Sequence, residues 1–316
     1  MSRRLLLIST STVFGTRYLE HAFGELRDVL AGVRQVLFVP FALVAQDAAA
    51  AAWVALASAA TVLGIALMPV ASRVRWLVLL LAGLMWPVAY AIKLGQVTPL
   101  LLLAFVAAWR WIDRPAAALG IAGGLGMVVK LQPGLLLLWG LLRRRWSGAF
   151  LGLAVAFAMV LVTLPIVTLG AYLDYAALLA RVGSPFDTPN NMAPGAVAAA
   201  VGLERGAASL LQWGSTILGM GIVVLTARRS APAPSLLAAM VVSQLASPVL
   251  WEHYAMVLLL PIAWLLERRQ WWVLGVPALM SVPAVGVTPA WVYPAAFWVL
   301  LLAITRLGLR EGRART

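Results

Sequence analysis

The segment GLGMVVKLQPGLLLLWGLLRRRW, residues 124–146, decides the fold. Two apolar runs stand on either side of a polar break, KLQP, and the second run ends in three consecutive arginines. Each run is shorter than the roughly 20 apolar residues with which an α-helix crosses the hydrocarbon core, and such short runs favour broken or re-entrant segments. The segment therefore predicts a helical membrane protein whose backbone is interrupted near Lys130.

The composition of the whole chain supports this interpretation. Of its 316 residues, 63% are apolar and 11% are charged, and the mean hydropathy is +0.95. Soluble domains carry about 25% charged residues, so a soluble globular enzyme is excluded. The chain has no cysteine, which excludes disulfides, thiolate metal sites and a cysteine nucleophile.

Further apolar runs continue the pattern along the chain. We expect an all-α, polytopic integral membrane protein with about 11 membrane helices, including short broken ones. The six longer runs are 48–70, 76–92, 147–170, 207–227, 270–285 and 290–305. The five shorter runs are 97–109, 115–129, 133–142, 234–246 and 254–266.

The basic residues predict the orientation. If alternate loops face the same side, most arginines fall on one side, which is the cytoplasmic pattern and absorbs most of the net charge of +13. A nucleic-acid partner is therefore not expected. The resulting division is an external or interfacial segment at 1–47, a transmembrane domain at 48–306 with an external loop at 171–206, and a basic cytoplasmic tail at 307–316.

Polar breaks gather on the opposite, external side. They are KLGQ (93–96), KLQP (130–133), the loop 171–206 and SPVLWEH (247–253). Non-helical backbone at membrane depth is tolerated only where protein or a water-filled cavity surrounds it. We therefore expect a polar cavity that opens to the external side, with Gln96 and Gln132 as candidate substrate-binding residues.

Lys130, Glu252 and His253 are the first candidates for chemistry, because ionisable residues at membrane depth are costly and usually functional. Lys130 stands at a predicted helix break, where its ammonium suits an anion, although it could equally extend to the headgroups. Lys93 is a similar case in a weaker context. His253 can donate to a phosphate oxygen or transfer a proton. The alternative for Glu252 and His253 is a helix start at the interface, beside Trp251 and Tyr254.

Two further segments carry polar candidates. The loop 171–206 contains Arg181, Asp187, Asn190 and Asn191, which could contact substrate or belong to a solvated, turn-rich loop. The first 47 residues hold Glu20 and Asp28, on a stretch that fits a surface helix as well as a catalytic segment. No nucleotide-binding or metal-binding motif is present in the sequence, so we expect no metal and no cofactor.

Several segments together resemble glycosyltransferase family 87, a family of GT-C class membrane enzymes that use polyprenyl-phosphate sugars. The similar segments are GQVTPLLLLAFVAAWRW (95–111), residues 124–146, the Asn-Asn pair at 190–191, and LASPVLWEHYAMVLLLP (245–261). Each is weak alone. The Lys-x-x-Pro segment followed by Ser-Pro-x-x-Trp-Glu-His is more specific.

The resemblance implies a GT-C-like fold in a bacterial inner membrane. It also implies transfer of a hexose, with mannose favoured, from a polyprenyl-phosphate-sugar to a glycan or glycolipid acceptor on the periplasmic face. A carboxylate of the first external loop would be the base; Glu20 matches best and Asp28 second. The donor phosphate would contact Lys130, His253, Arg181 and Lys93. The substrates would also contact Gln96, Gln132, Asp187, Asn190, Asn191, Trp251 and Glu252.

Two other functions fit the same pattern. A lipid or solute transporter, or a flippase, would also show many spans, broken helices and a polar cavity. Against it, the candidates gather on one face and no inverted halves are visible. A catalytically silent relative is the other alternative, because the helix and acidic loop expected near the N-terminus are short in this chain.

Overall fold

A computed structural model describes residues 46–114, 117–181, 186, 188, 190–281 and 289–314. Within these residues the fold is helical and contains no strand. The first half consists of α2 (Gln46–Leu67), α3 (Ser72–Leu84), α4 (Trp86–Lys93), α5 (Thr98–Arg110), α6 (Ala117–Val129), the 3-10 turn η2 (Gln132–Gly134) and α7 (Leu135–Leu142).

The second half begins with a long helix and ends with another. It consists of α8 (Trp146–Arg181), α9 (Pro194–Ala200), α10 (Arg205–Arg229), α11 (Pro232–Leu245), the 3-10 helix η4 (Glu252–Leu258), α12 (Leu259–Glu267), the 3-10 turn η5 (Trp271–Leu274), α13 (Gly275–Met280) and α14 (Val292–Arg313). Most of these helices lie within the apolar runs that the sequence predicts, whereas α9 and the end of α8 lie in the expected external loop.

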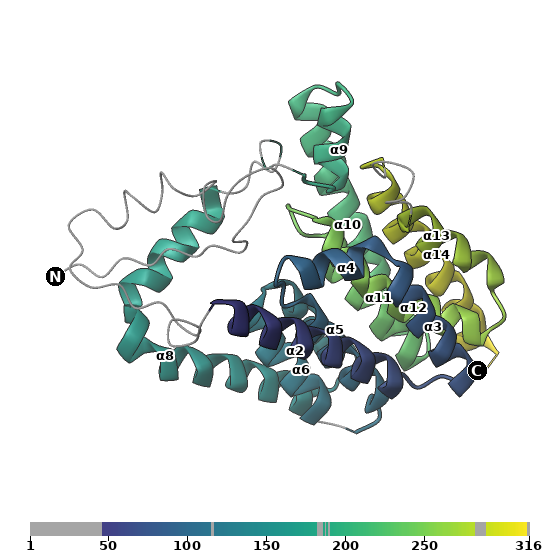
Figure 1. The fold of residues 1–316 in the computed structure, drawn as a ribbon, viewed down its shortest axis with the longest axis horizontal. Coiled ribbons are helices and arrows are strands. Elements are labelled where there is room, and N and C mark those ends of the chain that lie inside the picture. The colour runs from purple at the N-terminus through teal and green to yellow at the C-terminus, as the bar shows by residue number, and fades with distance from the viewer. Residues whose placement is uncertain are drawn as a thin grey trace.

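The core lies around α11, α12 and η4. Every residue of α11 from Pro234 to Leu245 is buried, and so is every residue of α12 from Leu259 to Leu266. Helices α10, α14, α7 and α5 contact α11, and α3 and α14 contact α12. Figure 1 shows α10, α11, α12 and α14 grouped on one side of the bundle, with α2 and α6 on the other. A helix that is apolar all round is buried, which explains the central place of α11.

Four described helices are long and apolar enough to cross a membrane: 48–67, 146–165, 205–229 and 292–313. Helices α3 and α4 add a fifth span if the bent pair is counted as one, with a 63° bend at Met85. The remaining apolar helices are shorter, so eleven spans are not confirmed. The short helices end at Pro, Gly and polar breaks, where the helix cannot extend to the length of a full span.

Helix α8 differs most from the sequence prediction. We expected a span ending at Gly170 and a loop from 171 to 206, but the helix runs on to Arg181 and α9 occupies part of the rest. Residues 171–181, AYLDYAALLAR, are rich in alanine and leucine, which have the highest helix propensities. The helix is interrupted at Thr168 (φ 65°, ψ 152°), three residues after Pro165, and beyond the break it extends away from the bundle (Figure 1).

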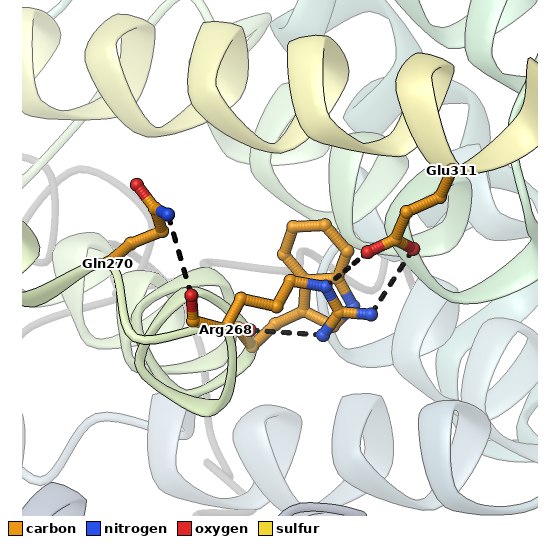
Figure 2. A network of polar contacts seen from close by, with 4 residues as sticks. Arg268, Gln270 and Glu311 are labelled. Carbon is orange, nitrogen blue, oxygen red and sulfur yellow. Dashed lines mark hydrogen bonds and ion pairs between the residues drawn. The ribbon is translucent and has the colours of Figure 1, made fainter. Parts of the chain in front are cut away.

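The end of the chain is also more helical than expected. Helix α14 continues through Arg313, so the predicted tail at 307–316 begins as helix. Arg268 anchors it: the Arg268 guanidinium contacts Glu311 with N–O distances of 2.6 and 3.3 Å and lies 3.6 Å from the centre of the Trp264 ring (Figure 2). This pair joins the end of α12 to α14. Both oxygens of the Glu311 carboxylate take part, which makes the contact more specific than a single ion pair.

Candidate active site

Lys130 directly follows α6, and the packing of α6 fixes its position. Helix α6 lies against α8 through small residues: a Cβ atom on Gly124 would be 2.5 Å from the carbonyl oxygen of Gly152. The KLQP turn folds back just as closely, since a Cβ on Gly126 would be 2.8 Å from the ring of Pro133. The Lys130 amide donates to the Gly126 carbonyl at 2.8 Å, which ends the helix at this residue. Glycines thus allow the turn that carries Lys130.

The second polar break, SPVLWEH, is held from outside by Asn191. Its Oδ1 accepts from the amides of Ala193 and Leu250, both at 2.9 Å, and its Nδ2 donates to the carbonyl of Pro248 at 3.0 Å. The Met192 amide adds a hydrogen bond to the Leu250 carbonyl at 2.6 Å. Asn191 is 8% exposed. The Asn-Asn loop therefore fixes the backbone that leads into η4.

Two glutamines hold the start of the same break. The Gln132 amide nitrogen donates to Ser247 Oγ at 3.1 Å, which links KLQP directly to SPVLWEH. Gln212, in the middle of α10, accepts from the Gly195 amide at 3.0 Å and donates to the Ser247 carbonyl at 3.4 Å. Buried polar groups of this kind are satisfied by hydrogen bonds, and they rigidify the segment that they contact.

Lys130, His253 and Tyr254 meet in the interior. The Lys130 Nζ lies 4.2 Å from the centre of the Tyr254 ring, and the His253 ring contacts Tyr254 edge-on with centres 4.8 Å apart. The Trp251 ring stacks on His253 at 5.8 Å. These side chains come from two breaks more than a hundred residues apart in the sequence, which the fold brings together.

The polar atoms at this place are buried without partners. Lys130 Nζ and both ring nitrogens of His253 have no hydrogen-bond partner among the residues that the structure describes. These two residues lie outside the four long helices and the bent α3–α4 pair. Burial lowers the pKa of the Lys130 ammonium to about 7, and burial followed by the charge of Lys130 lowers the pKa of the His253 imidazole. An unpaired buried cation is costly, so this place suits an anion.

Glu252 points to a different neighbour. Its Oε2 accepts a hydrogen bond from the indole Nε1 of Trp86 at 2.8 Å, and the Trp86 ring stacks on Tyr90 with centres 5.2 Å apart. Burial raises the pKa of the Glu252 carboxyl, and the Trp86 hydrogen bond acts in the opposite direction. All three side chains are half-buried. Helix α4 is thereby joined to η4.

The other predicted site residues are less closely connected to this cluster. Lys93 ends α4 with an exposed side chain, whereas Gln96 is buried. Asn190 is exposed and adopts a left-handed backbone conformation with φ 54°. Arg181 is the last residue of α8, and its side chain is not described. Glu20, Asp28 and Asp187 lie outside the described residues.

Two cavities lined by described residues do not correspond to the expected open polar cavity. One is a small gap lined by Thr98 and apolar side chains of α5, with Gln244 and Val257. The other is an open apolar groove along α3, from Trp76 to Leu84. Neither is lined by Lys130 or His253. The Tyr254 ring lies against the Lys130 ammonium, and the Trp251 ring stacks on the His253 imidazole.

Three contributors were absent from the sequence prediction. Gln212 could have been found, because a glutamine inside an apolar helix needs a polar partner. Trp86 and Tyr254 carried no such signal, since aromatic residues are common at membrane interfaces. Among the described residues no group of three or more His, Asp or Glu side chains could hold a metal ion, and the prediction of a metal-free site stays untested.

The chain belongs to glycosyltransferase family 87. The family model matches residues 35–248 of the 316, which include Lys130, Gln132, Asn191 and Gln212 and end within the SPVLWEH break. With the apolar helices, this makes the chain a membrane protein of a glycosyltransferase family, and the resemblance of the sequence motifs is confirmed at the level of the family.

Other comparisons add little. A stretch of 44 residues is 54% identical to a probable alpha-aspartyl dipeptidase of Drosophila melanogaster, covering 13% of this chain and 18% of that protein. The chain thus spans under a fifth of the curated relative that it matches, and that short stretch carries no argument about activity. No solved structure matches the chain significantly.

Proposed function

We propose that this chain transfers a hexose, with mannose favoured, from a polyprenyl-phosphate-sugar to a glycan or glycolipid acceptor. The acceptor side would be the external, periplasmic face of a bacterial inner membrane. The observation that carries the proposal is the buried pair of Lys130 Nζ and the His253 imidazole, which have no hydrogen-bond partner among the described residues, in a chain of glycosyltransferase family 87.

The chemistry follows from the charges. An acceptor hydroxyl oxygen forms a bond to the anomeric carbon, while the bond from that carbon to the phosphate oxygen breaks and the electron pair leaves with the polyprenyl phosphate. The Lys130 ammonium and a His253 N–H stabilise the charge on the leaving phosphate, where a low-dielectric site makes fixed donors most effective. The proton of the acceptor hydroxyl passes to a carboxylate.

Glu20 is the proposed base and Asp28 the second choice, from the family resemblance alone. Asp187 is a weaker candidate. Glu252 directly precedes His253 in the sequence, but its carboxylate accepts a hydrogen bond from Trp86, and we assign it a role other than that of the base. Lys93 and Arg181 remain proposed contacts of the phosphate, and Gln96, Asn190 and Trp251 remain proposed contacts of the substrates.

The test is a transfer assay in nanodiscs with radiolabelled polyprenyl-phosphate-mannose, polyprenyl-phosphate-glucose and extracted membrane glycolipids. Label should move to a new product with the wild type and not with Lys130→Ala. Asp113→Asn is the matched control, because the Asp113 side chain is 89% exposed and pairs only loosely with Arg145 at 3.8 Å. Full transfer by Lys130→Ala would remove Lys130 from the mechanism. Absence of transfer from every donor by folded wild type would favour a transporter or a silent relative.

A further inference from the structure

Glu252 and the two aromatic side chains of α4 form a cluster that the phosphate chemistry does not use. The Glu252 carboxylate is fixed through Oε2 by the Trp86 indole, and among the described residues its Oε1 accepts no hydrogen bond. The stacked Trp86 and Tyr90 rings lie beside it, half-buried. Because the neutral Trp86 indole occupies only one carboxylate oxygen, the other oxygen can still accept hydrogen bonds from a ligand.

The neighbours of this cluster on η4 indicate which part of a ligand Glu252 would contact. Glu252 and His253 are consecutive residues of η4, and His253 belongs to the group around Lys130 and Tyr254. In a polyprenyl-phosphate-sugar the hexose is bonded directly to the phosphate. A donor whose phosphate contacts His253 has its hexose within reach of the side chains that flank His253 on η4, and Glu252 is one of these.

We infer that Glu252, Trp86 and Tyr90 form the subsite for the transferred hexose. This inference rests on the proposed function and adds the residues that recognise the sugar. Glu252 Oε1 accepts hydrogen bonds from hexose hydroxyls, and the aromatic faces cover the C–H face of the ring. Small-molecule sites commonly combine aromatic walls with a few fixed polar groups in this way. Besides offering its ring face to the sugar, Trp86 positions Glu252 through the indole N–H.

The alternative role for the same contacts is structural. Trp86 and Glu252 join α4 to η4, and a contact that only fastens two helices would affect every ligand alike. The two roles differ in one measurable quantity, the ratio of the affinities for a sugar-bearing and a sugar-free lipid. Polyprenyl phosphate has the phosphate and the tail but no hexose, so it probes the Lys130 site alone.

The experiment measures equilibrium binding of radiolabelled polyprenyl-phosphate-mannose and of polyprenyl phosphate of equal chain length, to purified protein in nanodiscs. Glu252→Gln keeps an acceptor for Trp86, and Trp86→Phe keeps an aromatic ring. Each should weaken binding of the mannose lipid about tenfold and leave binding of polyprenyl phosphate within twofold, because a hydrogen bond to a charged group is worth at least this much. Tyr90→Leu should show the same selectivity.

The controls separate failure of this inference from failure of the proposed function. Asp113→Asn and Trp271→Phe, exposed residues distant in the chain, should behave as the wild type. Equal loss of both lipids in Glu252→Gln, or no loss of either, would overturn the hexose subsite. Wild type that binds neither lipid would overturn the proposed function itself. Because Trp86→Phe could loosen α4, Glu252→Gln alone decides the outcome if the thermal midpoint of Trp86→Phe falls.

Discussion

The ammonium nitrogen of Lys130 lies 4.2 Å from the centre of the Tyr254 ring, although 124 positions separate the two residues in the sequence (254 − 130 = 124). The contact is a cation–π interaction, in which the ring face attracts the charge without providing a hydrogen-bond acceptor. Tyr254 thus holds the ammonium in the interior while its N–H donors stay available. The contact joins the KLQP break to Tyr254 on η4, directly after SPVLWEH, and so links two segments that no single motif contains.

The ring of Tyr254 should matter more than its hydroxyl. Tyr254→Leu removes the π-face and should weaken binding of polyprenyl-phosphate-mannose about tenfold, a typical worth for a desolvated cation–π contact. Tyr254→Phe keeps the face and loses the interaction of the hydroxyl with Gln132, so its dissociation constant should stay within about threefold. Equal losses in the two variants would show that the cation–π contact does not hold Lys130.

Binding of the donor should depend on pH through Lys130. The pKa of its ammonium lies at about 7, so the charged form is lost as the pH rises above that value. The donor is a phosphodiester, whose charge is constant in this range. Its dissociation constant should rise about tenfold or more from pH 7 to about pH 9, because the protein must take up a proton to bind.

Lys130→Arg is the matched variant for the pH dependence. A guanidinium stays protonated throughout this range, so the affinity of Lys130→Arg should be flat between pH 7 and about pH 9, whatever its absolute value. Titration of radiolabelled donor at several pH values measures both curves. A wild-type curve as flat as that of Lys130→Arg would contradict the assignment.

Asn191 should contribute stability rather than substrate contact. Asn191→Ala removes three hydrogen bonds to backbone groups, two of them at Pro248 and Leu250 and one at Ala193, and should lower the free energy of unfolding by about 2 kcal/mol. Asn191→Asp keeps the acceptor Oδ1 but places a carboxylate oxygen against the Pro248 carbonyl in a buried position, so its loss should be at least as large. The exposed neighbour serves as control: Asn190→Gly suits the left-handed backbone there and should be nearly neutral.

The measurement for these asparagine variants is thermal unfolding of detergent-solubilised protein, followed by donor binding at a temperature where all variants are folded. A normal thermal midpoint for Asn191→Ala would show that its hydrogen bonds do not hold the SPVLWEH break. Lost donor binding at normal stability would instead return Asn191 to the group of substrate contacts.

Gly124 should be intolerant of any side chain. A Cβ there meets the Gly152 carbonyl at 2.5 Å, so Gly124→Ala should force α6 away from α8 and cost about 1–3 kcal/mol of stability. Because α6 ends at Lys130, donor binding should fall as well. Gly214→Ala on α10 is the control, since no atom lies within 4 Å of its Cβ position. Unfolding curves of the two variants that coincide would contradict the close packing of α6 on α8.

Glu311 should affect stability without affecting the donor. Glu311→Gln breaks the two-point contact with Arg268 that Figure 2 shows, and both side chains are about one third exposed. Solvent screening limits the loss to about 1 kcal/mol. The thermal midpoint should fall slightly, while the dissociation constant of polyprenyl-phosphate-mannose stays unchanged. A large change in donor affinity would show that this end of α14 communicates with the site.

The sequence was sufficient for the helical membrane class. It singled out Lys130 and His253 because ionisable residues stand out in an apolar chain, and their role in a site stays a prediction. It could not give their neighbours. Whether Trp86 contacts Glu252 depends on the 63° bend between α3 and α4. In the sequence, only Met85 and Pro87 indicate that bend. The extension of α8 past Gly170 was missed because a helical continuation and a loop both tolerate Tyr172 and Asp174. The number of membrane spans could not be predicted either, because tertiary packing decides where short apolar helices end.

The central claim is that Lys130 and His253 form one phosphate site. The most direct test compares the dissociation constants of polyprenyl phosphate for the wild type, Lys130→Met, His253→Asn and the double variant, in nanodiscs at about pH 7. Each single variant should bind about tenfold more weakly, and the double variant should lose less than the product of the two, because both groups contact the same anion. Wild-type affinity in Lys130→Met, or fully multiplicative losses in the double variant, would contradict a shared site.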